Sequence, residues 1–236
     1  GQNIFTTSDF ARFALIIFTA SFIASNKKNI NNLKTIFSNY LIFVIITLGL
    51  ILFQPDLSST FIISIILLSM LIVGGLKLKF IGNLAVVGSS ILCFAIMFFP
   101  YMRTRFWGWF SNTNPDPTSQ VERAKQALHN GGLAGNGVGD SIIKEGFMAE
   151  VHTDFILPII GEELGFIGIL ILFISFATFY ILSIRIAKKA PDIFSSMLSL
   201  GIAFTITYYF LINSAYVVGI IPPTGLAIPF ISYGGS

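Results

Sequence analysis

Long apolar stretches separated by short polar breaks run through most of this chain. A helix that crosses the hydrocarbon core of a membrane needs about 20 mostly apolar residues. This pattern predicts spans at Phe10–Ser25, Ile36–Phe53, Thr60–Leu76, Phe80–Tyr101, Leu164–Ile184 and Ile193–Val218. The alternation typical of a β-barrel is absent from the sequence, and helices satisfy their own backbone groups in lipid. We therefore expect an all-α, polytopic membrane helical bundle with about six spans.

The composition agrees with a membrane protein. Of the 236 residues, 54% are hydrophobic and 11% are charged, whereas a soluble domain carries about 25% charged residues. Cys93 is the only cysteine, which excludes an intramolecular disulfide framework and a thiolate metal site. We expect residues 1–236 to form a single integral membrane domain. The missing initiator Met and the end directly after an apolar run suggest a fragment of a longer protein.

Three short loops on one side of the predicted bundle collect most of the basic residues. These residues are Lys27, Lys28, Lys34, Lys77, Lys79, Arg185, Lys188 and Lys189. The positive-inside rule places this side in the cytoplasm. Residues 102–154 then form a long extracytoplasmic loop, and most acids of the chain face outward.

The end of this loop holds the main candidate for chemistry. Asp154 follows Glu150 and His152 and directly precedes an apolar segment, and a carboxylate near hydrocarbon loses hydration worth several kcal/mol unless it is compensated. Burial and Glu150 are expected to raise the pKa of Asp154 toward a value that suits a general base. An ion pair with a loop cation is the structural alternative. Glu162 and Glu163 are expected to cap a helix, and the spacing around His152 is not that of a zinc site.

Other parts of the loop leave two interpretations open. Arg103 and Arg105 can bind a phosphate group or anchor the chain at the interface. Gly135-Asn-Gly-Val-Gly139 can form turns with positive φ or a phosphate-binding backbone. We further expect a turn at Asn112–Thr118 and an amphipathic helix at Ser119–His129.

Several motifs occur together in one order. They are Gln54-Pro-Asp-Leu57, Gly132-Leu-x-Gly-x-Gly-x-Gly139, Glu150-x-His-Thr-Asp-Phe155, Gly161-Glu-Glu-Leu-Gly165 and Pro223-Thr-Gly225 with Pro229–Ser236. This arrangement closely resembles the shape, elongation, division and sporulation family of FtsW, RodA and SpoVE type, from about Thr7 to Ser236. The residues of these motifs resemble those of FtsW more than those of RodA. Family members have about ten spans, so the resemblance implies that this fragment holds the fourth to the ninth.

The resemblance implies a peptidoglycan glycosyltransferase that polymerises lipid II at the outer face of the bacterial cytoplasmic membrane, for cell division or elongation. Asp154 matches the aspartate regarded as catalytic in the family, and inversion with an undecaprenyl-pyrophosphate leaving group is expected. No cofactor is implied, although a divalent metal stays an alternative. The residues expected to bind substrate are Glu150, Arg103, Arg105, Lys144 and His152.

The implied partners are lipid II, the glycan linked to undecaprenyl pyrophosphate, a class B penicillin-binding protein and other divisome or elongasome membrane proteins. No nucleic acid is expected. A lipid II flippase and a generic proton-coupled carrier are the alternative functions. A carrier should place ionisable groups near mid-membrane with a path to both sides, whereas these acids gather at the outer interface. The glycosyltransferase is therefore the favoured prediction.

Overall fold

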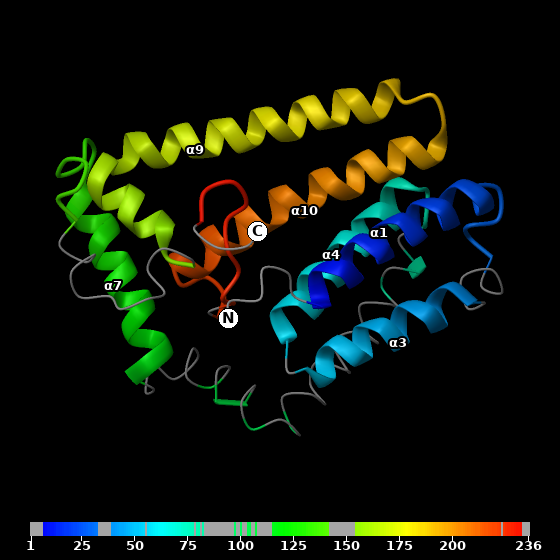
Figure 1. Cartoon of the computed structure of the whole chain (residues 1–236), viewed down its shortest axis with the longest axis horizontal. Helices are drawn as coiled ribbons and strands as arrows, with labels where there is room; N and C mark the ends of the chain where they lie inside the picture. The colour runs from blue at the N-terminus through cyan, green and yellow to red at the C-terminus, as the bar shows by residue number, and fades with distance from the viewer. Residues whose placement is uncertain are drawn as a thin grey trace. The chain divides into compact units, whose positions relative to one another are not determined.

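A computed structural model shows an all-helical protein in its described part (Figure 1). The described residues are 7–32, 39–54, 56–77, 79–80, 82, 97, 100, 103–104, 107, 115–141, 154–222 and 224–232. The helices with defined bounds there are α1 (Thr7–Asn26), α3 (Asn39–Phe53), α4 (Leu57–Val73), α7 (Pro115–Gly131), α9 (Ile156–Lys189) and α10 (Ile193–Val217). These residues contain no strand, and the predicted all-α fold is confirmed.

The apolar helices match the predicted spans. Helices α1, α9 and α10 are long and apolar enough to cross a membrane, and α3 and α4 are shorter apolar helices. The membrane helical bundle is therefore confirmed. The predicted span Phe80–Tyr101 lies almost entirely outside the described residues.

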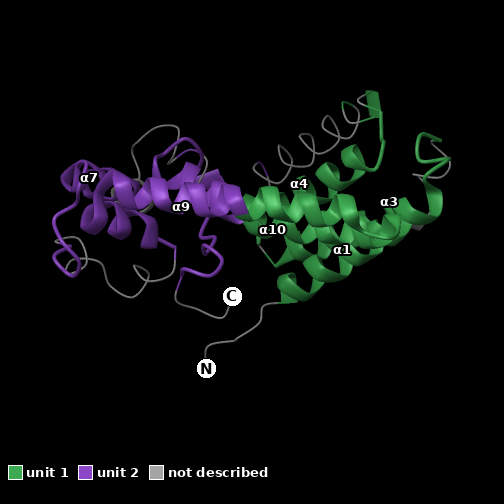
Figure 2. Cartoon of the chain, turned by 90° about the horizontal axis from the view of Figure 1, so that it is seen from above, with its two compact units in different colours: residues 1–94, 179–208 green, residues 95–178, 209–236 purple. Residues whose placement is uncertain are grey.

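Residues 1–94 and 179–208 form one compact unit, green in Figure 2. In this unit α1 contacts α3 and α4. A Cβ atom added at Gly201 of α10 would lie 2.5 Å from the Ile16 side chain and 2.9 Å from the Met70 sulfur, so α10 packs closely on α1 and α4. The buried apolar side chains of this core include Leu15, Ile16, Ile62, Ile63, Ile66 and Met70.

Residues 95–178 and 209–236 form a second compact unit, purple in Figure 2. It contains α7, the first part of α9, the end of α10 and the C-terminal segment. Helix α7 buries Val121, Ala124 and Ala127 and exposes its charged face, as the amphipathic pattern predicts. This unit holds the candidate site.

Polar residues between the apolar stretches cap the helices that follow them. The Ser59 N–H donates to the Asp56 carboxylate at 3.0 Å at the start of α4. The Ser195 N–H donates to the Asp192 carboxylate at 2.8 Å at the start of α10. This hydrogen bond lowers the pKa of Asp192, because it stabilises the ionised form.

Two helix boundaries differ from the prediction. The turn expected at Asn112–Thr118 is replaced from Pro115 onward by α7, because the fixed φ of proline suits the first helical turn. Helix α9 begins at Ile156 rather than at Leu164, and its helical geometry is interrupted at Gly165 (φ 67, ψ −165). The apolar pattern does not reveal this interruption, since both immediate neighbours of Gly165, Leu164 and Phe166, are apolar.

Candidate active site

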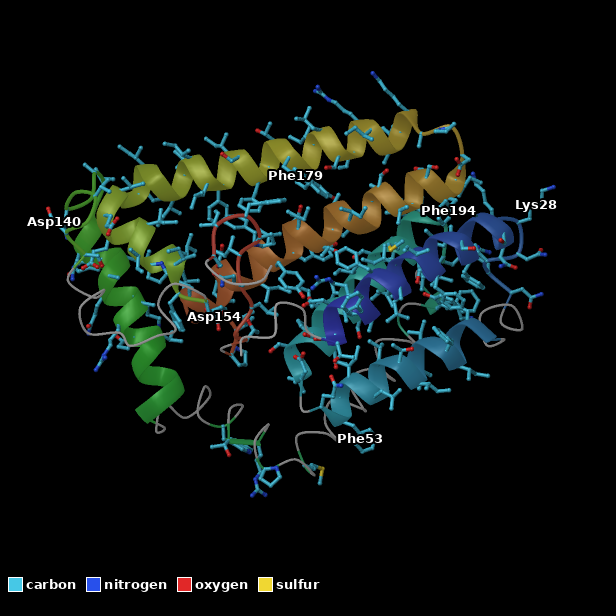
Figure 3. The ribbon with its side chains drawn as sticks, in the orientation of Figure 1. Lys28, Phe53, Asp140, Asp154, Phe179 and Phe194 are labelled. Atoms are coloured by element: carbon cyan, nitrogen blue, oxygen red, sulfur yellow. The ribbon has the colours of Figure 1, made fainter. Side chains whose placement is uncertain are left out.

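Asp154, the predicted catalytic residue, lies in a turn directly before α9 (Figure 3). Its main-chain carbonyl accepts hydrogen bonds from the Asn213 side-chain amide, at 2.9 Å, and from the Tyr216 hydroxyl. Phe155 is buried, and its ring packs edge-on against the ring of Tyr216 with centroids 5.3 Å apart. Two side chains of α10 therefore hold the backbone of Asp154, and they do so through the carbonyl rather than the carboxylate.

The segment that follows α10 passes beside this carboxylate. The Asn213 amide donates a second hydrogen bond, of 2.6 Å, to the carbonyl of Leu226. Gly225 has φ 68, and a Cβ atom added to it would lie 3.3 Å from Oδ2 of Asp154. The fold thus brings Gly225 beside Asp154, although the two residues are far apart in the sequence.

The surroundings of Asp154 bear on its candidate role as a general base. Asp154 is half-buried, so it is neither enclosed in the protein nor fully hydrated. Helix α9 begins at Ile156, and the partial positive charge of a helix N-terminus favours a nearby carboxylate. A general base must combine a restrained position with access for the substrate. The backbone of Asp154 is held in place by hydrogen bonds, and the residue is partly exposed.

The structure describes Arg103 alone among the residues predicted to bind substrate. Arg103 is exposed and forms no ion pair with any described residue. Arg105, Lys144, Glu150 and His152 lie outside the described residues, so their roles stay predictions. Within the described part of the chain, no three His, Cys, Asp or Glu side chains gather as metal ligands.

Asn213 is a site residue that the sequence analysis did not single out. It is the only asparagine of α10 and is fully buried. A polar side chain inside a membrane helix is costly unless it has partners, and such residues often mark functional sites. A lone asparagine among apolar residues was therefore an available signal. Tyr216 gave no comparable signal, because tyrosine is common near the ends of membrane helices.

Residues 132–141, here called the glycine loop, dock on α9. The N–H groups of Asn136 and Gly137 donate to the carbonyls of Glu162 and Glu163, at 3.0 and 3.1 Å. Glycines with positive φ in this loop are Gly132, Gly135, Gly137 and Gly139. The interpretation as turns that need positive φ is confirmed. The phosphate-binding alternative is wrong for the N–H groups of Asn136 and Gly137, because carbonyls already occupy them.

Glu162 has a different role from the predicted one. Its side chain is 0% exposed, and its Oε2 accepts a hydrogen bond of 2.5 Å from the Ser141 hydroxyl. Capping was expected for Glu162, but the partner that the structure gives its carboxylate is the Ser141 side chain. Glu163 is half-buried.

Comparison with known proteins places this geometry in context. Residues 3–236 match a family described as cell cycle protein and named for FtsW, RodA and SpoVE. The chain is 37% identical over 232 residues to a probable peptidoglycan glycosyltransferase FtsW of Trichlorobacter lovleyi, across 97% of this chain and 61% of that protein. It is 34% identical over 232 residues to the stage V sporulation protein E of Bacillus subtilis, across 97% of this chain and 63% of that protein.

A solved structure shares the fold. This structure is described as "Structural coordination of polymerization and crosslinking by a peptidoglycan synthase complex". The two chains superpose with a TM-score of 0.79 and are 20% identical, and the match covers 98% of this chain and 65% of that chain. The chain thus spans less than two thirds of the length of each of these three proteins.

Proposed function

Because this chain belongs to the cell cycle protein family of FtsW, RodA and SpoVE, we propose that the full-length protein is a peptidoglycan glycosyltransferase that polymerises lipid II. The observation that carries the proposal is the placement of Asp154. Its backbone is held by Asn213 and Tyr216, and its carboxylate lies beside Gly225. The names of the FtsW relatives support the same activity.

In the proposed reaction Asp154 is the general base. Its carboxylate takes the proton from the 4-hydroxyl of the GlcNAc of an incoming lipid II. The hydroxyl oxygen attacks the anomeric carbon of the glycan that is carried on undecaprenyl pyrophosphate. A new C–O bond forms while the bond to the pyrophosphate breaks, so the anomeric configuration inverts and undecaprenyl pyrophosphate leaves. No step is assigned to a metal or a cofactor.

The leaving pyrophosphate requires positive charge near it. Arg103, Arg105 and Lys144 are the proposed sources, because fixed cations stabilise the charge that develops on a departing group. Glu150 and His152 are proposed to contact sugar hydroxyls or to adjust the proton affinity of Asp154. The exposure of Arg103 supports its availability to a ligand.

The proposed location is the bacterial cytoplasmic membrane, with the active site facing outward. The basic residues of the short loops support this orientation, because such residues stay in the cytoplasm. The proposed partner is a class B penicillin-binding protein, together with other membrane proteins of division or elongation. A peptidoglycan synthase complex among the solved structures of similar fold supports such a partnership.

The proposal is tested by Asp154→Asn in the full-length protein with its penicillin-binding partner. Asparagine keeps the size of the side chain but does not accept the proton, and general base catalysis contributes about 100- to 10,000-fold. We expect lipid II polymerisation to fall by about 100-fold or more. The measurement is the length and amount of glycan strands formed from labelled lipid II.

The matched control is Asp140→Asn, which changes an exposed aspartate of the glycine loop (Figure 3) and should leave polymerisation unchanged. Full polymerisation by the Asp154→Asn protein would refute the proposed base. Movement of labelled lipid II across liposomes without polymerisation, and without need for Asp154, would instead identify a flippase.

A further inference from the structure

The glycine loop supplies hydrogen-bond partners that α9 lacks at its interruption. Gly165 departs from helical geometry (φ 67, ψ −165), so the next N–H groups cannot all bond to carbonyls one turn earlier in α9. The N–H of Phe166 donates to the carbonyl of Gly132 at 2.9 Å, and the N–H of Ile167 donates to that of Leu133 at 3.2 Å. The loop therefore completes the helix on the far side of the interruption.

The near side is completed in the same way. The carbonyls of Glu162 and Glu163 accept hydrogen bonds from the N–H groups of Asn136 and Gly137. Backbone groups without partners are costly next to a membrane. The loop and this part of α9 consequently depend on one another for their hydrogen bonds.

The two backbones also touch without side chains between them. A Cβ atom added at Gly131 would lie 1.9 Å from the carbonyl oxygen of Gly161. One added at Gly135 would lie 2.1 Å from the carbonyl oxygen of Glu163. One added at Gly165 would lie 2.4 Å from the nitrogen of Gly135. Such contacts allow little displacement of the loop relative to α9.

A buried hydrogen bond between two side chains also secures this docking. The Ser141 hydroxyl donates to Glu162 at 2.5 Å, and the two residues are 4% and 0% exposed. A buried carboxylate is costly, and an apolar side chain of similar volume often serves stability as well or better. Buried polar contacts are best known for selecting one arrangement among several. We call the Ser141–Glu162 hydrogen bond the latch.

We propose that Ser141 and Glu162 are positioning residues for Asp154, an inference that rests on the proposed function. The part of α9 before its interruption follows directly on the turn of Asp154 and has Glu162 near its end. The latch fixes this part at one end, while the contacts from α10 hold the Asp154 carbonyl at the other. The direction of the helix start, and with it the carboxylate of Asp154, depends on both.

The test replaces both members of the latch by apolar groups, Ser141→Ala with Glu162→Leu, in the full-length protein. Because no polar group of the pair is left buried, we expect an equal or higher Tm. Misplacement by about 1 Å can cost about 100-fold in rate, so kcat should fall about tenfold or more while KM for lipid II stays within about twofold. Glu162→Gln keeps an acceptor for Ser141 and should keep most of kcat.

The matched control is Ser175→Ala, at an exposed serine elsewhere on α9, which should change neither kcat nor Tm. Hydrogen exchange gives a readout that is independent of activity, since the N–H groups of Phe166 and Ile167 should exchange faster in the latch variant. A wild-type kcat in the latch variant would overturn the proposal. The proposal would also be overturned if kcat of the latch variant fell only in proportion to a loss of stability seen as a lower Tm.

Combining the latch variant with Asp154→Asn distinguishes a failure of the positioning proposal from a failure of the proposed function. In that background the latch variant should cause no further loss of activity, because the residue that it positions is already gone. Full activity of Asp154→Asn alone would defeat the proposed base. The latch would then be judged by exchange, where faster exchange at Phe166 and Ile167 supports it and unchanged exchange overturns it.

Discussion

One buried amide joins three segments of the candidate site. The nitrogen of the Asn213 side chain donates to the carbonyls of Asp154 and Leu226, so α10, the turn before α9 and the C-terminal segment meet at this group. Tyr216 adds a second donor to the Asp154 carbonyl. These bonds are made where a carbonyl has little water to replace them, so each is costly to remove.

Removing the Asn213 donor should lower the free energy of unfolding more than removing the Tyr216 donor. Tyr216→Phe removes one of two donors to a single carbonyl and should lower the free energy of unfolding by about 1 kcal/mol. Asn213→Ala withdraws a donor from two carbonyls and should cost about 2 kcal/mol or more. Thermal unfolding of the purified protein measures both. Tyr180→Phe on α9 is the control, and an equal loss for this variant would contradict the assignment.

The interruption of α9 illustrates how one element can depend on another. Helix α7 ends at Gly131, where the backbone of Gly161 is so close that a Cβ atom would lie 1.9 Å from its oxygen. The next residues then form the loop that pairs with α9 on both sides of Gly165. The end of α7, the loop and the start of α9 therefore form one structural group.

A pair of glycine substitutions tests this close approach. Gly49 lies in α3 with nothing within 4 Å of an added Cβ atom, so Gly49→Ala should gain helix propensity of up to about 1 kcal/mol. Gly131→Ala, at the last residue of α7, drives a methyl group into the backbone of Gly161 and should destabilise by about 2 kcal/mol or more. Equal unfolding temperatures for the two variants would show that the backbones are not in contact.

The charges of the whole chain divide between its loops. Lys27 and Lys28 follow α1, and Lys188 and Lys189 end α9. Asp154 lies in the turn directly before the opposite end of α9. Short loops rich in lysine remain in the cytoplasm during insertion, so the two ends of α9 should lie on different sides of the membrane.

Cysteine labelling tests this orientation. Val138 of the glycine loop is 81% exposed. In a Cys93→Ser background, a cysteine introduced by Val138→Cys should react with a membrane-impermeant maleimide in intact spheroplasts. Lys28→Cys, also at an exposed position, should react only after lysis. The reverse pattern would place the candidate site in the cytoplasm and would be incompatible with polymerisation at the outer face.

The helices were predictable because their signals are local. The apolar stretches of α1 and α10 predict spans close to the observed ones, and the spacing of Val121, Ala124 and Ala127 predicts the buried face of α7. Asp154 could be singled out as a candidate as well, from its place between a polar loop and an apolar segment and from the motif around it, and its catalytic role stays a prediction. These inferences use only neighbouring residues.

The contacts that define the site depend on residues far apart in the chain. Ser141 and Glu162 are 21 positions apart, and Asn213 is 59 positions from Asp154. Capping was a reasonable expectation for Glu162 from its neighbours, but the docked loop offered it Ser141 instead. Local hydropathy and periodicity determine which segments become helices and which faces they bury. Which backbone groups then meet is decided when distant segments pack, because only packing brings their donors and acceptors within reach.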